Sequence, residues 1–171
     1  VFQSNISVAI AYDSRKFSKE FAQWSAKVFS ANKIKVYLFS ELRPTPELSF
    51  AIRKLKCNCG IVITASHNPK EYNGYKVYWK DGGQITKPHD KLILNEINKL
   101  SDINNINISK NNKNISLISE EIDKEYIKKI KVPLKKVAIE LNHEIIDKRR
   151  LVKIKLKNYD KIEIVHFIGG G

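Results

Sequence analysis

The sequence predicts an α/β fold in which helices cover a parallel sheet. Three short apolar segments, at residues 7–12, 35–39 and 60–63, have the pattern of buried strands. The two segments between them carry helical features and are long enough for crossover connections, which join parallel neighbours in a sheet. The order strand, helix, strand, helix, strand therefore indicates a parallel sheet with helices packed against it.

The first connecting segment is predicted to be a helix from Ser18, as its N-cap, to about residue 31. Several of its side chains recur at helical spacing and are expected to face the sheet. They are Phe21, Trp24, Ser25, Val28 and Phe29. The second connection opens with a stiff turn at residues 43–46, which puts Pro46 in the first turn of a helix ending near residue 56.

Residues 75–79 alternate like a further strand, and a turn at 81–83 leads to residues 84–85 as the start of a returning strand. An amphipathic helix is expected over 88–100, and a polar, Asn- and Lys-rich loop over 104–114. The helix is expected to turn four apolar side chains inward, namely Leu92, Ile93, Ile97 and Leu100.

The last part of the chain begins with a predicted helix over 119–132, whose acidic start and basic end suit the helix dipole. Pro133 should interrupt it. Residues 134–156 are basic and partly amphipathic, 162–165 suggest one more strand, and the chain ends in three glycines at 169–171.

The residues with the clearest chemistry follow the third predicted strand, in the segment Thr-Ala-Ser-His-Asn-Pro at 64–69. Pro69 and small polar residues end the strand, so Ser66 is presented by a turn. A hydroxyl held among imidazole, amide and ammonium groups suits covalent group transfer, and converging backbone N–H groups suit phosphate binding. Because ligands gather at the carboxyl ends of parallel strands, Arg15 in the loop after the first strand is expected to lie near Ser66.

Residues 64–69, followed by Tyr-Asn-Gly-Tyr-Lys at 72–76, closely resemble the phosphoserine loop of the α-D-phosphohexomutase superfamily. Residues 73–79 and 88–90 are more similar to its phosphoglucomutase and phosphopentomutase branch than to the phosphomannomutases. The resemblance extends from about residue 7 to 100. It implies a three-layer α/β/α domain with a mixed, mainly parallel sheet.

The resemblance also implies roles for individual residues. Ser66 would carry a phosphoryl group, pass it to a sugar monophosphate and take back the other phosphate of the resulting bisphosphate. Phosphate would thus move between positions 1 and 6 of a hexose, or 1 and 5 of a pentose. Arg15 and Lys76 would stabilise the phosphoryl group and assist proton transfer, and His67 would act beside them in the catalytic loop. The expected phosphate- or substrate-binding residues are Thr64, Ala65, Asn68 and Asn73.

Further partners follow from the same resemblance. The parent enzyme would need Mg²⁺, bound in this chain only through the phosphate on Ser66, and glucose 1,6-bisphosphate as an activator. Residues 1–118 would form domain I without its N-terminal part, and 119–171 would form linker helices and a truncated start of domain II. The metal loop, the sugar-recognition loop and the rest of domains II to IV are missing. We therefore expect an isomerase fragment that is inactive alone.

Composition bears on location and on rival functions. No apolar run approaches the roughly 20 residues that span a bilayer, and no signal peptide is visible. Cys57 and Cys59 are too close in the sequence for an ordinary disulfide. Together these observations favour a cytoplasmic protein. The net charge of +13 is spread along the chain and suits phosphorylated metabolites, although it also fits a simple bias toward Lys.

Two rival functions stay open. One is a non-catalytic module that binds phosphate or a metabolite through the same loop, with Ser66 never phosphorylated. The other is a nucleic-acid-binding domain, based on the charge and on a basic cluster at 148–150. The sequence contains no recognisable nucleic-acid motif, so we rank this second rival last.

Overall fold

The computed structural model describes residues 6–100, 102–130 and 137–166 of the 171-residue chain. Its contacts divide the chain into two units, Val1–Ile127 and Lys128–Gly171, and each is described by itself. The domain boundary expected at 118/119 stays a prediction. The expected break at Pro133 and the glycines at 169–171 lie outside the described residues.

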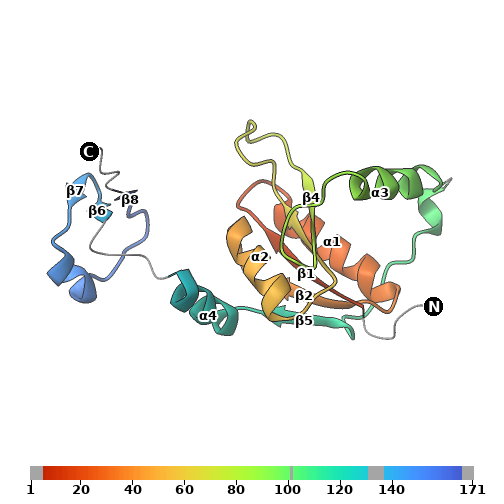
Figure 1. Cartoon of the computed structure of the whole chain (residues 1–171), viewed down its shortest axis with the longest axis horizontal. Helices are drawn as coiled ribbons and strands as arrows, with labels where there is room; N and C mark the ends of the chain where they lie inside the picture. Colours follow the sequence, from red (N-terminus) through yellow and green to blue (C-terminus); the bar gives the residue numbers. More distant parts are fainter. Residues whose placement is uncertain (1–5, 101, 131–136, 167–171) are drawn as a thin grey trace. The chain divides into compact units, whose positions relative to one another are not determined.

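The first unit is built on a five-stranded sheet (Figure 1). The strands are β1 (Ser7–Tyr12), β2 (Lys35–Phe39), β3 (Cys59–Ile63), β4 (Tyr75–Trp79) and β5 (Ile115–Ile118), in the spatial order β4-β3-β1-β2-β5. β4 runs antiparallel to β3, whereas all the other neighbours are parallel. The predicted mixed, mainly parallel sheet is confirmed.

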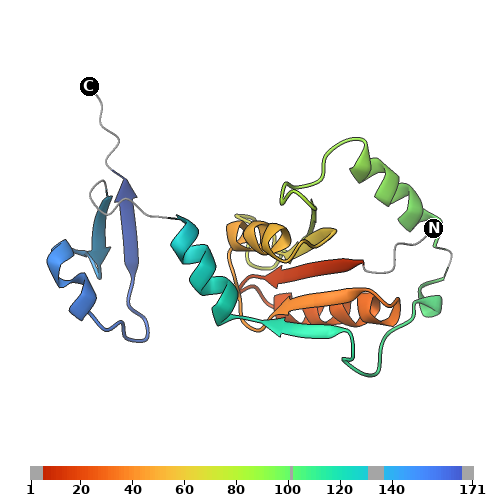
Figure 2. The same ribbon diagram turned by 60° about the horizontal axis from the view of Figure 1, so that its bottom comes forward.

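Helices cover both faces of this sheet, as the view in Figure 2 shows. On one face, α1 (Ser18–Ala31) packs against the even-numbered residues of β1. On the other, α2 (Thr45–Lys54) packs against Ala9 and Ala11, and Ile122 of α4 (Glu120–Ile130) belongs to the same hydrophobic core. Because successive strand residues point to opposite faces, the fully buried β1 contributes to both cores. The three-layer α/β/α arrangement is thus confirmed.

The face that α1 turns to the sheet differs from the expectation. Its buried residues are small: Ser18, Ala22, Ala26 and Ser30. Phe21 and Trp24, which were expected to face inward, are 46% and 54% exposed, so that prediction is wrong. Small side chains let a helix lie close to a sheet, and Phe21 and Trp24 are left on the outer face of the helix. Phe29 packs against the core, so the expectation is confirmed for that residue. Ser18 is also the first helical residue rather than the N-cap, which is Phe17.

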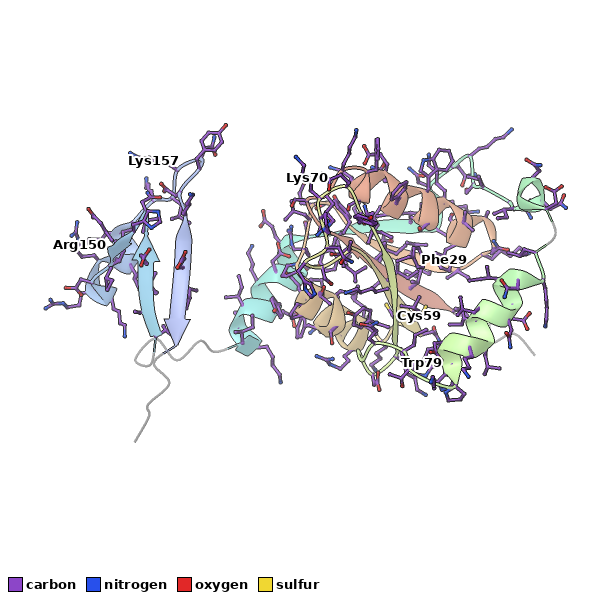
Figure 3. The ribbon with its side chains drawn as sticks, turned by 90° about the horizontal axis from the view of Figure 1, so that it is seen from above. Phe29, Cys59, Lys70, Trp79, Arg150 and Lys157 are labelled. Carbon is purple, nitrogen blue, oxygen red and sulfur yellow. The ribbon has the colours of Figure 1, made fainter. Side chains whose placement is uncertain are left out.

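The helix α3 (His89–Asn98) has no buried residue. The expectation that its apolar side chains point inward is wrong, since Leu92 and Ile97 are more than half exposed. Its first residue, His89, stacks on Trp79 at the end of β4, with ring centroids 5.1 Å apart. Trp79 is labelled in Figure 3. The expected returning strand is reduced to a single bridge between Tyr78 and Gln84.

The second unit contains a small antiparallel sheet in the order β7-β6-β8. Its strands are β6 (Val137–Leu141), β7 (Glu144–Ile145) and β8 (Ile162–His166), and a 3₁₀ helix spans Lys148–Lys153. Only the last of these strands was expected. The side chains of Asn142 and Asp160 hydrogen-bond at 2.8 Å and tie together the two ends of the connection between β6 and β8.

Two further expectations concern membrane-spanning helices and the state of the two cysteines. No helix of the described residues is long and apolar enough to cross a membrane. Cys57 and Cys59 are both free, and Cys57 is buried. Burial raises the pKa of both thiols, that of Cys59 to about 11, which keeps them protonated at neutral pH.

The strand register determines which loops meet at the edge of the sheet. Tyr12 and Ile63, the last residues of β1 and β3, are direct partners, and the Asp13 N–H donates to the Ile63 carbonyl at 3.1 Å. The loops after β1 and β3 therefore begin side by side. The Arg43 N–H donates to the Tyr12 carbonyl at 3.1 Å, which brings the loop after β2 to the same edge.

Candidate functional site

The candidate site is the loop that follows β3, with Ser66 near its start. Thr64 and Ala65 are buried, whereas Ser66 is exposed. The φ angle of Ser66 is +56°, in the left-handed region that non-glycine residues rarely adopt. The Ser66 N–H donates to Thr64 Oγ1 at 3.0 Å, and the Asn68 N–H closes the turn on the Ala65 carbonyl at 3.1 Å. The loop thus holds its serine in a strained conformation.

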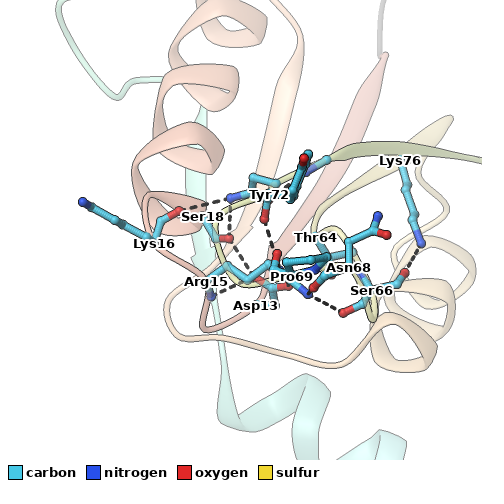
Figure 4. A network of polar contacts seen from close by, with 12 residues as sticks. Asp13, Arg15, Lys16, Ser18, Thr64, Ser66, Asn68, Pro69, Tyr72 and Lys76 are labelled. Atoms are coloured by element: carbon cyan, nitrogen blue, oxygen red, sulfur yellow. Dashed lines mark hydrogen bonds and ion pairs between the residues drawn. The ribbon is translucent and has the colours of Figure 1, made fainter.

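Arg15 reaches across from the loop after β1 and binds this loop through its main chain (Figure 4). Its Nη2 donates to the carbonyls of Ser66 at 2.6 Å and Asn68 at 2.7 Å. Its Nη1 donates to the carbonyls of Pro69 at 2.8 Å and Tyr72 at 3.1 Å. The expected proximity of Arg15 and Ser66 is therefore confirmed, and the contacts found for the guanidinium are with the loop itself. A role in binding a phosphoryl group stays a prediction.

Asp13 lies beneath Arg15. Its Oδ2 is 3.3 Å from Arg15 Nε, and its Oδ1 accepts hydrogen bonds from Ser18 Oγ at 2.6 Å and from the Arg15 N–H at 3.0 Å. Burial by itself would raise the pKa of this carboxyl. Hydrogen bonds from Ser18, Thr64 and Arg15, together with the charge of Arg15, outweigh burial and hold the pKa below its usual value. Asp13 is therefore a carboxylate at neutral pH.

Asn73 connects the far end of the loop to the start of α1. Its Nδ2 donates to Ser18 Oγ at 2.9 Å and to the Lys16 carbonyl at 3.3 Å. Its Oδ1 accepts from the N–H of Gly74 at 2.9 Å. The predicted site residue Asn73 thus supports the loop through contacts with protein atoms.

Lys76 lies on β4, where it pairs with Val62 of β3 across the antiparallel ladder. From there its Nζ donates a hydrogen bond to Ser66 Oγ (Figure 4). An ammonium group beside this hydroxyl favours negative charge on the serine oxygen or on a group attached to it. Lys76 is the predicted site residue that the structure places directly on the Ser66 side chain.

Two cavities open at Ser66. The first, of about 400 Å³, is lined by all the predicted site residues except Arg15, together with Gly74 and Tyr75. The second, of about 770 Å³, lies on the Arg15 side. Its lining consists of Asp13, Ser14, Arg15, Lys16, Ser66, Asn68, Lys70 and Glu71. Lys70 stands on the loop (Figure 3), so cations from two loops line this second cavity.

The structure gives less support to the expected roles of His67 and of a metal ion. His67 is exposed, and its side chain makes no hydrogen bond or ion pair with another described residue. Within residues 6–100, 102–130 and 137–166, no group of three or more His, Cys, Asp and Glu side chains could hold a metal ion. The described residues therefore do not form a magnesium site by themselves.

The sequence did not identify Asp13 or Ser18 as part of the site. A signal was available, because Asp13 follows a buried strand and precedes Arg15 by two residues, at the same edge as Thr64. Short side chains in such a position can hydrogen-bond nearby main-chain and side-chain groups. Lys16 and Lys70 were also missed, since lysines in exposed loops are common.

Comparison with known proteins agrees with this site. A family model described as "Phosphoglucomutase/phosphomannomutase, alpha/beta/alpha domain I" matches residues 1–104. A phosphoglucomutase of Staphylococcus aureus is 42% identical over 130 residues, which are 74% of this chain and 24% of that protein. A phosphoglucomutase of Staphylococcus epidermidis is 41% identical over 127 residues, 72% of this chain and 23% of that protein. The chain thus spans about a quarter of the length of these relatives.

A solved structure and a second family model complete the comparison. The crystal structure of a putative phosphomannomutase from Thermus thermophilus matches with a TM-score of 0.51 and 37% identity, over 52% of this chain and 20% of that one. A model described as the ThiS family matches residues 92–171, which include the whole second unit. Since the first family model matches more than half of the sequence, the chain belongs to the phosphoglucomutase/phosphomannomutase family, through its alpha/beta/alpha domain I.

Proposed function

We propose that the first unit is the phosphoserine domain of a phosphosugar mutase and that Ser66 carries the phosphoryl group. The observation that carries this proposal is the contact between Lys76 Nζ and Ser66 Oγ, on a loop braced by Arg15. The names of the relatives, phosphoglucomutase, support a hexose phosphate as substrate. The proposed reaction moves phosphate between positions 1 and 6 through a sugar bisphosphate.

In the proposed charging step, the bond between phosphorus and a sugar oxygen breaks while a bond between phosphorus and Ser66 Oγ forms. The proton of the Ser66 hydroxyl passes to the sugar oxygen that leaves, so a bisphosphate becomes a monophosphate. Lys76 stabilises the charge on the serine oxygen during this transfer. His67 is exposed in the same cavity and can contact the phosphoryl oxygens as they arrive.

The second cavity supports binding of the anionic substrate. Arg15, Lys16 and Lys70 line it together with Ser66, and these cations outnumber the carboxylates of Asp13 and Glu71 in the same lining. Cations that converge on a cavity raise the local concentration of anions such as sugar phosphates. Magnesium would reduce the charge of the transferring group, but its ligands other than the Ser66 phosphate are not found among the described residues. The two free cysteines support the further proposal of a reducing, cytoplasmic location.

Phosphate mapping tests this proposal. The chain is incubated with glucose 1,6-bisphosphate and Mg²⁺, and phosphate is located by intact and peptide mass spectrometry. We expect one phosphate on Ser66, lost in Ser66→Ala and retained in Ser25→Ala, a control serine on α1 whose hydroxyl donates to the Phe21 carbonyl. A folded chain that takes up no phosphate, or takes it up elsewhere, would overturn the proposal and favour a non-catalytic anion-binding module.

The ThiS match favours a different assignment for the second unit. Residues 119–171, which include the second unit, were expected to form linker helices and a truncated start of the second mutase domain. The match to a separate family supports instead an independent module, with the described antiparallel sheet β7-β6-β8 as its framework. Chimeras distinguish the two: residues 1–127 and 1–171 are each joined to the downstream part of the S. aureus phosphoglucomutase. Turnover with 1–127 alone supports the independent module, whereas a requirement for 128–171 supports the second mutase domain.

A further inference from the structure

The peptide groups on both sides of Ser66 are held by side chains. Its N–H donates to Thr64 Oγ1 at 3.0 Å, and its carbonyl accepts from Arg15 Nη2 at 2.6 Å. The residue between these two contacts has φ = +56°. A left-handed conformation is unfavourable for serine, so it persists only where the surroundings impose it. Thr64 and Arg15 are the side chains that hydrogen-bond to the two peptide groups of Ser66.

One carboxylate, that of Asp13, interacts with both of these side chains. Its Oδ2 pairs with Arg15 Nε at 3.3 Å, and the nearby Thr64 side chain helps to lower the pKa of this carboxyl. Asp13 Oδ1 also accepts from Ser18 Oγ at 2.6 Å, and Asn73 Nδ2 donates to that hydroxyl at 2.9 Å. The first turn of α1 and the far end of the loop are thus joined to the same point.

We propose that Asp13 is a positioning residue for Ser66. Its carboxylate orients Arg15 and Thr64, which fix the Ser66 peptide groups and so direct Oγ toward Lys76. Asp13 does not touch the reacting atoms. This role rests on the proposed function only in its last step, the presentation of Oγ for phosphoryl transfer, because the effect on the Ser66 backbone is independent of that chemistry.

A simpler role for Asp13 makes a different prediction. If its only task were to stabilise the start of α1 through Ser18, its removal would cost the same stability whatever residue stood at position 66. A positioning role couples the two positions. Glycine adopts the left-handed conformation without strain, so a chain with glycine at position 66 no longer needs the support of Asp13 there.

A double-mutant cycle measures this coupling in the 171-residue chain by urea unfolding of the first unit. Asp13→Asn should raise the unfolding equilibrium constant about tenfold in the wild-type chain, through the loss of charged hydrogen bonds. In a Ser66→Gly background the same change should raise it about threefold or less. Equal effects in both backgrounds would overturn the proposal.

Asp81→Asn is the matched control. The Asp81 carboxylate also accepts a main-chain hydrogen bond two residues on, from the Gly83 N–H at 2.8 Å, but it lies outside the serine loop. Its effect on unfolding should be the same with Ser66 and with Ser66→Gly. Should Asp13→Asn fail to fold, Thr64→Val in the same cycle decides the question, because it removes the other contact that Asp13 orients.

A second readout connects the backbone to the chemistry. In Asp13→Asn, the three-bond HN–Hα coupling of Ser66 should move away from its wild-type value, and phosphorylation of Ser66 by glucose 1,6-bisphosphate should slow about tenfold or more. Asp81→Asn should change neither. If even the wild-type chain is not phosphorylated, the proposed function fails while the cycle and the coupling constant still decide the role of Asp13. An unchanged coupling constant in Asp13→Asn would overturn that role.

Discussion

Arg43 forms a two-point ion pair with Asp123, 80 residues away in the sequence. Arg43 Nε donates to Oδ1 at 2.8 Å and Nη2 donates to Oδ2 at 2.6 Å. The pair joins the loop before α2 to α4, and it is supplemented by the ion pair of Lys54 with Glu125. Because the main-chain N–H of Arg43 binds the Tyr12 carbonyl at the edge of the sheet, α4 is attached to the same edge as the site.

Removing this pair should loosen α4. Asp123→Asn keeps the size of the side chain but removes the charge that the Arg43 fork binds, so we expect a loss of about 1 to 2 kcal/mol in unfolding free energy. Faster amide exchange in α4 should accompany the loss. Glu121→Gln, on the same helix turn and exposed, is the control and should have little effect. Equal exchange rates in α4 for both variants would contradict the prediction.

Glu47 lies between these two residues and is 4% exposed. Its Oε1 is 3.8 Å from Arg43 Nε and has no hydrogen-bond partner among the residues that the structure describes. Burial raises the pKa of this carboxyl to about 7, and the neighbouring Asp123 adds to the effect through a hydrogen bond and its charge, while Arg43 opposes it. The pKa of Asp123 is lowered instead, chiefly by its hydrogen bond with Arg43.

The raised pKa of Glu47 and the lowered pKa of Asp123 predict how the stability of the fold depends on pH. The folded chain keeps a proton on Glu47 up to about pH 7, whereas the unfolded chain loses it near 4.5. Stability contributed at this site should therefore fall as pH rises from about 4.5 to 7 and stay low above 7. Asp123 acts at lower pH, because its stabilising effect is lost only below its ordinary value of 3.8.

Glu47→Gln isolates this effect. It removes the titration, so the variant should gain up to about 3 kcal/mol relative to wild type between pH 5 and pH 8. The difference between the two unfolding free energies, measured by urea at several pH values, cancels the histidines that titrate in the same range. A difference that does not change with pH would show that Glu47 is ionised in the folded chain at pH 5.

The edge of the sheet that carries the site was predictable from the sequence, because β1, β2 and β3 are apolar runs joined by connections of crossover length. The neighbours Arg15 and Ser66 followed from that topology alone. Asp13 was harder to find. Its importance depends on which donors the folded loops bring to its two oxygens, and no spacing along the chain encodes that.

Other elements were not predictable, for physical reasons that can be named. β5 is only four residues long, and the exposed Leu117 gives it no clear alternation, so its pairing with β2 decides its structure. On α1, hydrophobic size suggested an inward face containing Phe21 and Trp24. The residues that pack against the sheet are instead the small Ala22 and Ala26.

The packing of α1 gives a direct test of that last point. Ala26→Leu would force extra methyl groups into the contact between α1 and the sheet, where Ala26 is fully buried. We expect a loss of about 1 to 3 kcal/mol from overpacking. Trp24→Gln, a much larger change on the exposed face of the same helix, should cost less than about 1 kcal/mol. Urea unfolding of both variants measures the two effects, and the reverse order would mean that the helix buries its aromatic face.

Lys76 should matter for chemistry more than for folding. Lys76→Met keeps the length of the side chain and removes its charge from Ser66 Oγ. We expect the rate of Ser66 phosphorylation by glucose 1,6-bisphosphate to fall about 100-fold, by analogy with the loss of one charge-stabilising group. The unfolding free energy should stay within about 1 kcal/mol. Lys80→Met, at an exposed position just after β4, is the control and should leave the rate unchanged.

Gly74 links the serine loop to β4 and leaves no room for a side chain. Its carbonyl accepts from the Thr64 N–H at 3.0 Å, and a Cβ at this position would lie 2.7 Å from the Thr64 carbonyl oxygen. Gly74→Ala should therefore push the strand away from Thr64 and shift Lys76, two residues on, relative to Ser66.

Gly83→Ala is the matched control, because its Cβ would come no closer than 3.3 Å to a side-chain oxygen. We expect Gly74→Ala to cost about 1 to 3 kcal/mol and to slow phosphorylation of Ser66, while Gly83→Ala does neither. Both are measured by urea unfolding and by mass spectrometry of the phosphorylated chain. A Gly74→Ala chain that is as stable and as readily phosphorylated as wild type would show that the approach of β4 to Thr64 does not position Lys76.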